Sequence, residues 1–165
     1  MPPLHLLFGP VGAGKSTFAR KLCRQHHAVR LTVDDWMAQL FGADERPTVG
    51  RLEWYLERRQ RVLEQTWKLT LDLLAVGTPV VYEPGLIRRQ EREALYARAD
   101  EAGLKLAVYV LDAPREVRRE RVLRRNGEQG ETFAMEVPLA FFELASDLWE
   151  PPDDDERRER DIRLP

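Results

Sequence analysis

Residues 9–16, with the sequence GPVGAGKS, match the pattern G-x-x-x-x-G-K-[S/T] of a phosphate-binding loop, the P-loop. An apolar run, Leu4–Phe8, precedes this loop and predicts a buried strand, and the residues from Thr17 to Cys23 predict a helix. This order matters because backbone N–H groups in the loop and the positive end of the helix together attract phosphate. The segment therefore predicts an α/β fold that holds a nucleotide. A glycine-rich turn that happens to precede a lysine is the alternative.

The residues of the loop have separate expected roles. The glycines allow the backbone to bend and to approach the phosphates closely. Lys15 can reach the β- and γ-phosphates, the Ser16 hydroxyl can ligate Mg²⁺, and the Thr17 hydroxyl can contact the α-phosphate. The predicted nucleotide-binding set is Gly9, Gly12, Ala13, Gly14, Lys15, Ser16 and Thr17.

The composition limits the class of protein. The chain has 165 residues, enough for one domain with a proper core, so a single domain over 1–165 is expected. A net charge of −2 argues against a globally basic nucleic-acid binder but leaves room for a local basic groove. No apolar run reaches the length of a membrane span, no signal peptide is visible, and the one cysteine, Cys23, cannot form an internal disulfide. These features predict a cytoplasmic protein.

Two acidic residues follow the second predicted strand, Val29–Val33. Carboxylates at the carboxyl end of a parallel strand lie at the edge of the sheet where ligands bind. A kinase needs a base there to orient and deprotonate the acceptor hydroxyl, and Asp34 is the candidate. Asp35 is then a magnesium or acceptor contact, or the N-cap of a helix that begins at Trp36. In the competing interpretation both aspartates are caps.

A third predicted strand, Val80–Glu83, also ends in an acid. An apolar strand followed by a carboxylate is the outline of the Walker B segment, which lies near the magnesium ion. Glu83 stands where aspartate is commoner, which favours a contact with magnesium through water over a direct one. The predicted metal-site residues are therefore Ser16, Asp35 and Glu83.

A strongly basic helix is predicted after Pro114, a residue that the first positions of a helix tolerate. Arg118, Arg121 and Arg125 share one face of it, by spacings of three and four residues. The glycine-containing segment that follows suits a hinge, so we expect a lid over about 118–136. Arg121 and Arg125 are the candidates to meet charge on the transferred phosphoryl group. A solvated basic helix is the alternative.

The remaining elements are predicted from periodicity and from breaker residues. They are a long helix over about 52–76, a helix from Arg88 to Gly103, a strand over 104–111 and a helix over 137–149. Arg88 or Arg92 could face an acceptor, with a solvated charged face as the equal alternative. The charge run 153–161 is expected to be a solvated loop, and residues 162–164 a fragmentary fifth strand.

With these residues placed, the chain resembles the small P-loop kinases, which include polynucleotide 5′-kinases, gluconate kinases, chloramphenicol phosphotransferase and the zeta-toxin kinases. The similarity covers nearly the whole chain and rests on Gly9–Thr17, Asp34-Asp35, Val80–Glu83, the run from Ala113 to Asn126, and Glu150–Glu156. The resemblance implies a three-layer α/β fold with a parallel sheet of order 2-3-1-4-5 and helices on both faces. It also implies ATP as the donor, Asp34 as the base, and Arg121 or Arg125 as the lid arginine.

One departure bears on the acceptor. Polynucleotide kinases carry an arginine three residues after the base, where it holds a substrate phosphate, and this chain has Met37 there. We therefore expect an ATP- and Mg²⁺-dependent kinase acting on a small hydroxylated acceptor, such as a sugar, an antibiotic or a nucleoside-like compound. No membrane and no obligate protein partner is expected. A polynucleotide or RNA 5′-hydroxyl kinase is the less favoured alternative, and a nucleotide-binding switch without an acceptor is the alternative of another class.

Overall fold

The computed structural model describes residues 1–130 and 136–165. Among these residues, four parallel strands form one sheet in the order β2-β3-β1-β4. The strands are β1 (Leu4–Phe8), β2 (Val29–Thr32), β3 (Val80–Glu83) and β4 (Leu106–Val110). Arg163 adds a single parallel bridge to Tyr109 beside β4. The predicted order 2-3-1-4-5 is thus confirmed for its four strands, and a bridge of one residue occupies the fifth place.

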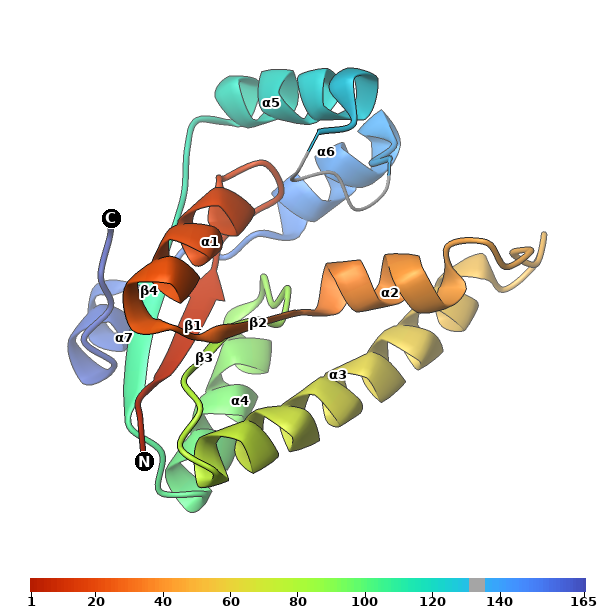
Figure 1. Cartoon of the computed structure of the whole chain (residues 1–165). Helices are drawn as coiled ribbons and strands as arrows, with labels where there is room; N and C mark the ends of the chain where they lie inside the picture. The colour runs from red at the N-terminus through yellow and green to blue at the C-terminus, as the bar shows by residue number, and fades with distance from the viewer. Residues whose placement is uncertain (131–135) are drawn as a thin grey trace.

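Seven helices in the described part of the chain surround this sheet (Figure 1). They are α1 (Lys15–His26), α2 (Val33–Phe41), α3 (Arg51–Ala75), α4 (Arg89–Glu101), α5 (Arg115–Glu128), α6 (Leu139–Leu148) and α7 (Asp154–Glu159). In the described residues no helix is both long and apolar enough to cross a membrane.

Alternate residues of each strand pack on opposite faces of the sheet, as the two-residue period of a strand requires. In β1, Leu7 packs against Ala19 of α1, whereas Leu6 and Phe8 belong to a larger cluster with α3 and α4 on the other face. All residues of β1 are buried. The result is the predicted three-layer α/β arrangement, with the carboxyl end of β1 leading directly into the P-loop (Figure 1).

The junction after β2 differs from the sequence prediction. The second strand ends at Thr32 and α2 begins at Val33, so Asp34 and Asp35 lie in the first helical turn rather than before it. Thr32, with extended backbone angles, is the N-cap, so the alternatives in which Asp35 or both aspartates cap the helix are wrong. The β-branched Val33 continues the alternation of the strand and hides this boundary. Negative side chains in the first turn also stabilise a helix through its dipole.

The C-terminal charge run is not the solvated loop that its composition suggests. It contains α7, which Asp153 caps by accepting a hydrogen bond from the backbone N–H of Glu156 at 2.9 Å. The Glu156 and Arg92 side chains are both 0% exposed and form an ion pair. The suggestion that Arg92 faces an acceptor is therefore wrong, because its guanidinium is buried and paired with Glu156. The helix was missed because its charges match the pattern of a solvated surface.

The long helix α3 agrees with the predicted range 52–76, but its N-terminal half does not contribute to the core as expected. Val62, Trp67 and Leu74 are buried, whereas Leu52 and Leu56 remain exposed. This first half extends beyond the edge of the sheet beside α2 (Figure 1). A helical stripe predicts a buried face only along the length that another element covers.

Candidate active site

The P-loop follows β1 and owes its shape to glycines with positive φ. Gly9, Gly12 and Gly14 have φ of 151°, 79° and 95°. A Cβ on Gly9 would overlap the carbonyl oxygen of Leu111, and a Cβ on Gly12 would stand 2.7 Å from the carbonyl oxygen of Arg118. Gly9 and Gly12 are therefore required for two reasons, a positive φ and the close approach of neighbouring backbone, whereas Gly14 is required for its positive φ alone.

The remaining loop residues lie where the phosphate-binding pattern requires them. Ala13 is buried, and Lys15, Ser16 and Thr17 form the first turn of α1, with Thr17 exposed. Lys15 Nζ donates to the carbonyl oxygens of Gly9 and Pro10, both at 2.9 Å. Burial lowers the pKa of Lys15, and the negative charges of Glu83 and Asp34 oppose that shift. Lys15 thus folds back on its own loop and has two acidic neighbours.

Asp34 lies next to the other predicted catalytic groups. Its Oδ1 is 3.9 Å from the position that a Cβ would take on Gly85, at the end of β3. Its negative charge opposes the lowering of the pKa of both Lys15 and Arg125. Burial raises the pKa of Tyr55, and the Asp34 carboxylate raises it further. The Asp34 carboxylate is therefore close enough to Lys15, Arg125 and Tyr55 to affect the pKa of all three.

The three predicted metal-site residues converge on one cation, Arg30 of β2. Its Nε donates to Glu83 Oε1 at 2.7 Å, its Nη1 to Asp35 Oδ2 at 2.9 Å and its Nη2 to Ser16 Oγ at 3.1 Å. Burial raises the pKa of Glu83, and the Arg30 guanidinium opposes that shift. Two carboxylates and a hydroxyl are the oxygen donors that Mg²⁺ prefers. The donor set is thus suited to a cation, and the protein itself places one there.

The predicted lid arginines have different surroundings. Arg118 is buried, and its Nη1 donates to the Val11 carbonyl oxygen and to Ser146 Oγ, both at 3.0 Å. Arg121 is exposed and its Nη1 donates to the Gly12 carbonyl oxygen at 3.3 Å. Burial lowers the pKa of Arg125, and in the described part of the protein its Nε has no hydrogen-bond partner. Of the predicted lid, 118–136, residues 131–135 lie outside the described residues.

Two site residues escaped the sequence analysis, Arg30 and Arg59. Arg30 carried a usable signal, since it is the one charged residue inside a short alternating strand, Val29–Thr32. No sequence signal distinguished Arg59, because it is one of several arginines on the polar face of α3. Its Nη2 donates to the carbonyl oxygens of Gly85, at 2.7 Å, and of Pro84, at 3.3 Å. Arg59 thereby fixes the turn after β3 close to Asp34.

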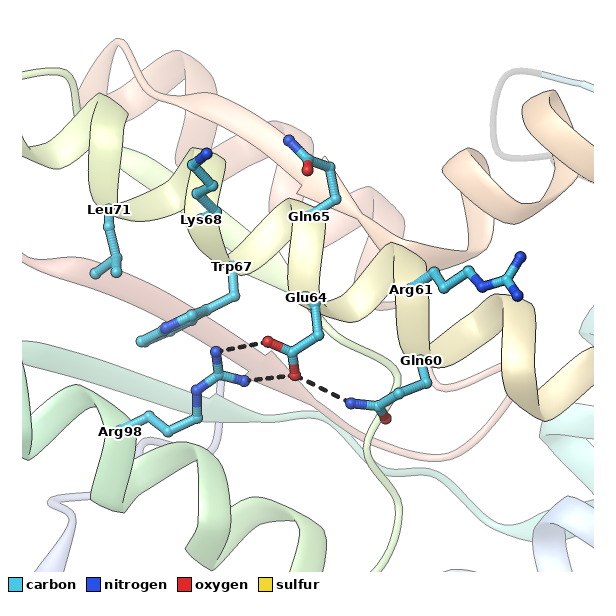
Figure 2. Close-up of a pocket in the computed structure, with 8 residues that line it drawn as sticks. All are labelled: Gln60, Arg61, Glu64, Gln65, Trp67, Lys68, Leu71 and Arg98. Atoms are coloured by element: carbon cyan, nitrogen blue, oxygen red, sulfur yellow. Dashed lines mark hydrogen bonds and ion pairs between the residues drawn. The ribbon is translucent and has the colours of Figure 1, made fainter.

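A separate pocket lies away from the P-loop, between α3 and α4 (Figure 2). Its lining residues are Gln60, Arg61, Glu64, Gln65, Trp67, Lys68, Leu71 and Arg98. Arg98 donates to both oxygens of Glu64, at 3.0 and 2.9 Å, and its guanidinium lies 5.2 Å from the centre of the Trp67 ring. None of the predicted site residues lines this pocket, and its central charges are already paired. The candidate active site is therefore at the carboxyl end of the strands, next to the P-loop.

The chain is similar to one protein family and to several solved structures. A family model described as an AAA domain, AAA_33, matches residues 4–152. The comparison with curated proteins finds no match. Among solved structures, a chain of the Pnkp1/Rnl/Hen1 RNA repair complex is 26% identical with a TM-score of 0.67. The match covers 89% of this chain and 43% of that one, so this chain spans less than half of its length.

Two further structures share the fold over almost the whole chain. Kti12 from Chaetomium thermophilum, in complex with ADP-AlF3, is 19% identical with a TM-score of 0.72, over 99% of this chain and 88% of that one. A gluconokinase from Sinorhizobium meliloti 1021 is 17% identical with a TM-score of 0.57, over 99% and 81%. The family match spans the P-loop, Asp34 and the basic helix α5. The chain therefore belongs to the AAA_33 family and has the P-loop kinase fold.

Proposed function

We propose that this protein is an ATP-dependent phosphotransferase that moves the γ-phosphoryl group to a hydroxyl of a small molecule. The observation that carries the proposal is the position of Asp34, whose carboxylate acts electrostatically on both Lys15 and Arg125. Nucleotide binding alone does not require a carboxylate beside the phosphate lysine. Proton abstraction from an acceptor hydroxyl does, because the base must lie next to the phosphoryl group under attack.

The chain's own groups divide the work of transfer. Lys15 exchanges the carbonyl oxygens of Gly9 and Pro10 for the β- and γ-phosphates, which carry a full negative charge and are stronger acceptors. Asp34 orients the acceptor hydroxyl and takes its proton. Arg121 and Arg125 supply positive charge on the side of α5. Ser16 would hold Mg²⁺, which would supply further charge neutralisation at the phosphates. Positioning and electrostatics then account for most of the rate enhancement.

The residues around Asp34 favour a small acceptor. Met37, at the position where polynucleotide kinases carry a phosphate-binding arginine, is buried in the core and offers no charge to a substrate. Tyr55 lies near Asp34, and its ring meets Phe141 of α6 edge to face, with centroids 6.5 Å apart. A tyrosine hydroxyl next to aromatic surface suits a compact, partly apolar molecule with hydroxyl groups.

One finding favours a second candidate, a 5′-hydroxyl kinase for RNA or another polynucleotide. The chain of the RNA repair complex is 26% identical to this one over 89% of this chain and 43% of that one. An oligonucleotide acceptor would need basic residues other than position 37. Arg46 and Arg58 stack on Trp54 near the junction of α2 and α3, with guanidinium-to-ring distances of 5.9 and 4.0 Å. These two arginines could contact the phosphate backbone of an oligonucleotide. This arrangement is also a common way to pack a surface tryptophan.

The test is phosphoryl transfer from γ-labelled ATP in the presence of Mg²⁺, with separate pools of sugars, nucleosides, hydroxylated antibiotics and 5′-hydroxyl oligonucleotides. Asp34→Asn is assayed beside the wild type, and Arg61→Met serves as a control on an exposed arginine of α3. We expect label in one small-molecule pool, on the order of 10²–10⁴ less with Asp34→Asn, and no change with Arg61→Met.

Each other outcome has a distinct meaning. Label in the oligonucleotide pool would replace the first candidate by the second. Label found as free phosphate alone, at the same rate in Asp34→Asn, would refute both kinases and support a nucleotide-binding switch. Loss of nucleotide affinity in Asp34→Asn, with turnover per bound nucleotide unchanged, would remove Asp34 from the role of base.

A further inference from the structure

Arg30 stands where a magnesium ion would meet the protein, and its three contacts are of unequal strength. We propose that, when a magnesium nucleotide binds, Arg30 gives up Ser16 and keeps Asp35 and Glu83. Ser16 would then be the direct magnesium ligand, with both carboxylates held outside the first coordination sphere by the guanidinium. The inference rests on the proposed nucleotide-dependent function but not on the identity of the acceptor.

The bond between Arg30 and Glu83 is the strongest of the three. It is 2.7 Å long, and the two side chains are 18% and 5% exposed. Glu83 is at the carboxyl end of β3, in the middle of the sheet between β2 and β1. Separating a buried ion pair leaves a charge without a partner in a medium of low polarity, which is strongly unfavourable. Magnesium would have to replace Arg30 at Glu83, and Arg30 would lose the more buried of its two charged partners.

The contact with Asp35 is geometrically good and open to solvent. Nη1 lies 2.9 Å from Asp35 Oδ2, and the aspartate side chain is 46% exposed. A second carboxylate on the same guanidinium strengthens the hold on Arg30, because opposite charges on both sides fix its plane. Arg30 therefore has two negative partners, which together carry one more unit of charge than it does. To leave this position, the guanidinium would have to give up both carboxylates.

The contact with Ser16 is the weak one. It joins a cation to a neutral hydroxyl at 3.1 Å, the longest of the three distances. A neutral acceptor is bound less strongly than an ionised one, so this bond breaks most easily. Ser16 is also the first-turn residue of α1 beside Lys15, where a nucleotide on the P-loop would present its phosphates. Magnesium and Arg30 Nη2 therefore compete for one oxygen, Ser16 Oγ, and not for the carboxylates.

The competition can be measured without any acceptor. Binding of ADP is followed by calorimetry over a series of Mg²⁺ concentrations, which gives the apparent magnesium affinity of the ADP complex. Ser16→Ala should weaken that affinity about tenfold or more, whereas Asp35→Asn should change it less than about threefold. Arg30→Met should strengthen it about tenfold, because it removes a nearby positive charge and frees the carboxylates. Adding Asp35→Asn to Arg30→Met should then remove much of this gain.

Two further variants serve as an alternative test and as a control. Arg30→Lys keeps a positive charge opposite Glu83 but cannot make three contacts at once, so it tests the same competition if Arg30→Met fails to fold. Arg61→Met is the matched control, since Arg61 is an exposed arginine paired with Glu57 on α3. It should leave magnesium affinity unchanged. With Mn²⁺ in place of Mg²⁺, the electron paramagnetic resonance spectrum of the ADP complex should be the same in wild type and Asp35→Asn.

The opposite results would overturn the inference. A loss of about tenfold or more in magnesium affinity for Asp35→Asn would make Asp35 a direct ligand. Weaker magnesium binding in both Arg30→Met and Arg30→Lys would mean that Arg30 supports the metal rather than competing with it. A wild-type protein that binds no ADP at any Mg²⁺ concentration would refute the proposed function itself. If the wild type binds ADP but the magnesium affinities of the variants differ from those expected above, only the role of Arg30 is refuted.

Discussion

The buried pair between Arg92 and Glu156 gives the sharpest test of the fold. Arg92 Nε and Nη2 donate to the two oxygens of Glu156 at 2.7 and 2.8 Å, and Tyr96 Oη donates to Glu156 Oε1 at 3.1 Å. Both charged side chains are wholly buried. In Glu156→Gln the carboxylate charge is lost, and an amide NH₂ faces a guanidinium that water cannot reach. Such a break of a buried pair destabilises a protein by about 3–5 kcal/mol.

That loss is large against the total stability of a domain, about 5–15 kcal/mol. For a chain of this size, each kcal/mol corresponds to about 2–4 °C in Tm, so Tm should fall by roughly 10 °C. The assay is urea denaturation followed by circular dichroism, with thermal melting beside it. Glu57→Gln is the matched control, because Glu57 pairs with Arg61 on the exposed face of α3. That substitution should change the free energy of unfolding by less than about 1 kcal/mol.

A double variant distinguishes the cost of an unpaired buried charge from the cost of losing the ion pair itself. Arg92→Met combined with Glu156→Met replaces both charges with apolar side chains of similar length. It should be more stable than Glu156→Gln alone, since no unpaired charge remains. The reasoning fails if Glu156→Gln costs less than about 1 kcal/mol, or if the double variant is no more stable than the single one.

Three further predictions concern the site and the pH dependence of stability. Lys15→Ala should abolish phosphoryl transfer while circular dichroism and Tm stay nearly unchanged; retained turnover would remove the P-loop lysine from the mechanism. Arg125→Ala and Arg121→Ala should each lower kcat more than nucleotide affinity, and equal losses in both constants would argue against contact with the transition state. Burial, with help from nearby positive charge, lowers the pKa of His5 from 6.5 to about 4. The unfolded chain therefore binds a proton first as pH falls from 6.5 toward 4, and the free energy of unfolding should drop by up to about 3 kcal/mol over that window. Urea titrations at several pH values would show this slope, which should be smaller in His5→Gln because the contribution of His5 is lost.

The sequence predicted the strands well because their signals are local. The apolar run Leu4–Phe8 followed by the glycine-rich loop specifies a strand, a phosphate loop and a helix within a short window. The strand Val80–Glu83 was predicted with its observed limits. The order of strands in the sheet came from the resemblance to P-loop kinases rather than from periodicity, because pairing partners lie far apart in sequence.

The partners of charged residues could not be predicted in the same way. Sequence patterns predict charged residues to be exposed unless neighbouring residues indicate otherwise. No residue near Arg92 or Glu156 in the sequence indicates that the two pair over a separation of 64 residues. The same holds for Arg30, which meets Glu83 across the sheet over a separation of 53 residues. Ser16, Asp35 and Glu83 all accept hydrogen bonds from Arg30, and their role as a metal site stays a prediction. The missing part was the arginine that already joins them.

Arg118 fixes the mechanical behaviour of the basic helix. It bonds the backbone of the P-loop and α6 at once, and its own carbonyl oxygen lies close against Gly12. A rotation of all of α5 about its first residue would break these bonds together. A lid movement would therefore require bending past Val122, which also borders Gly12. Such a bend would move Arg125 but leave Arg121, which donates to the Gly12 carbonyl oxygen, next to the loop.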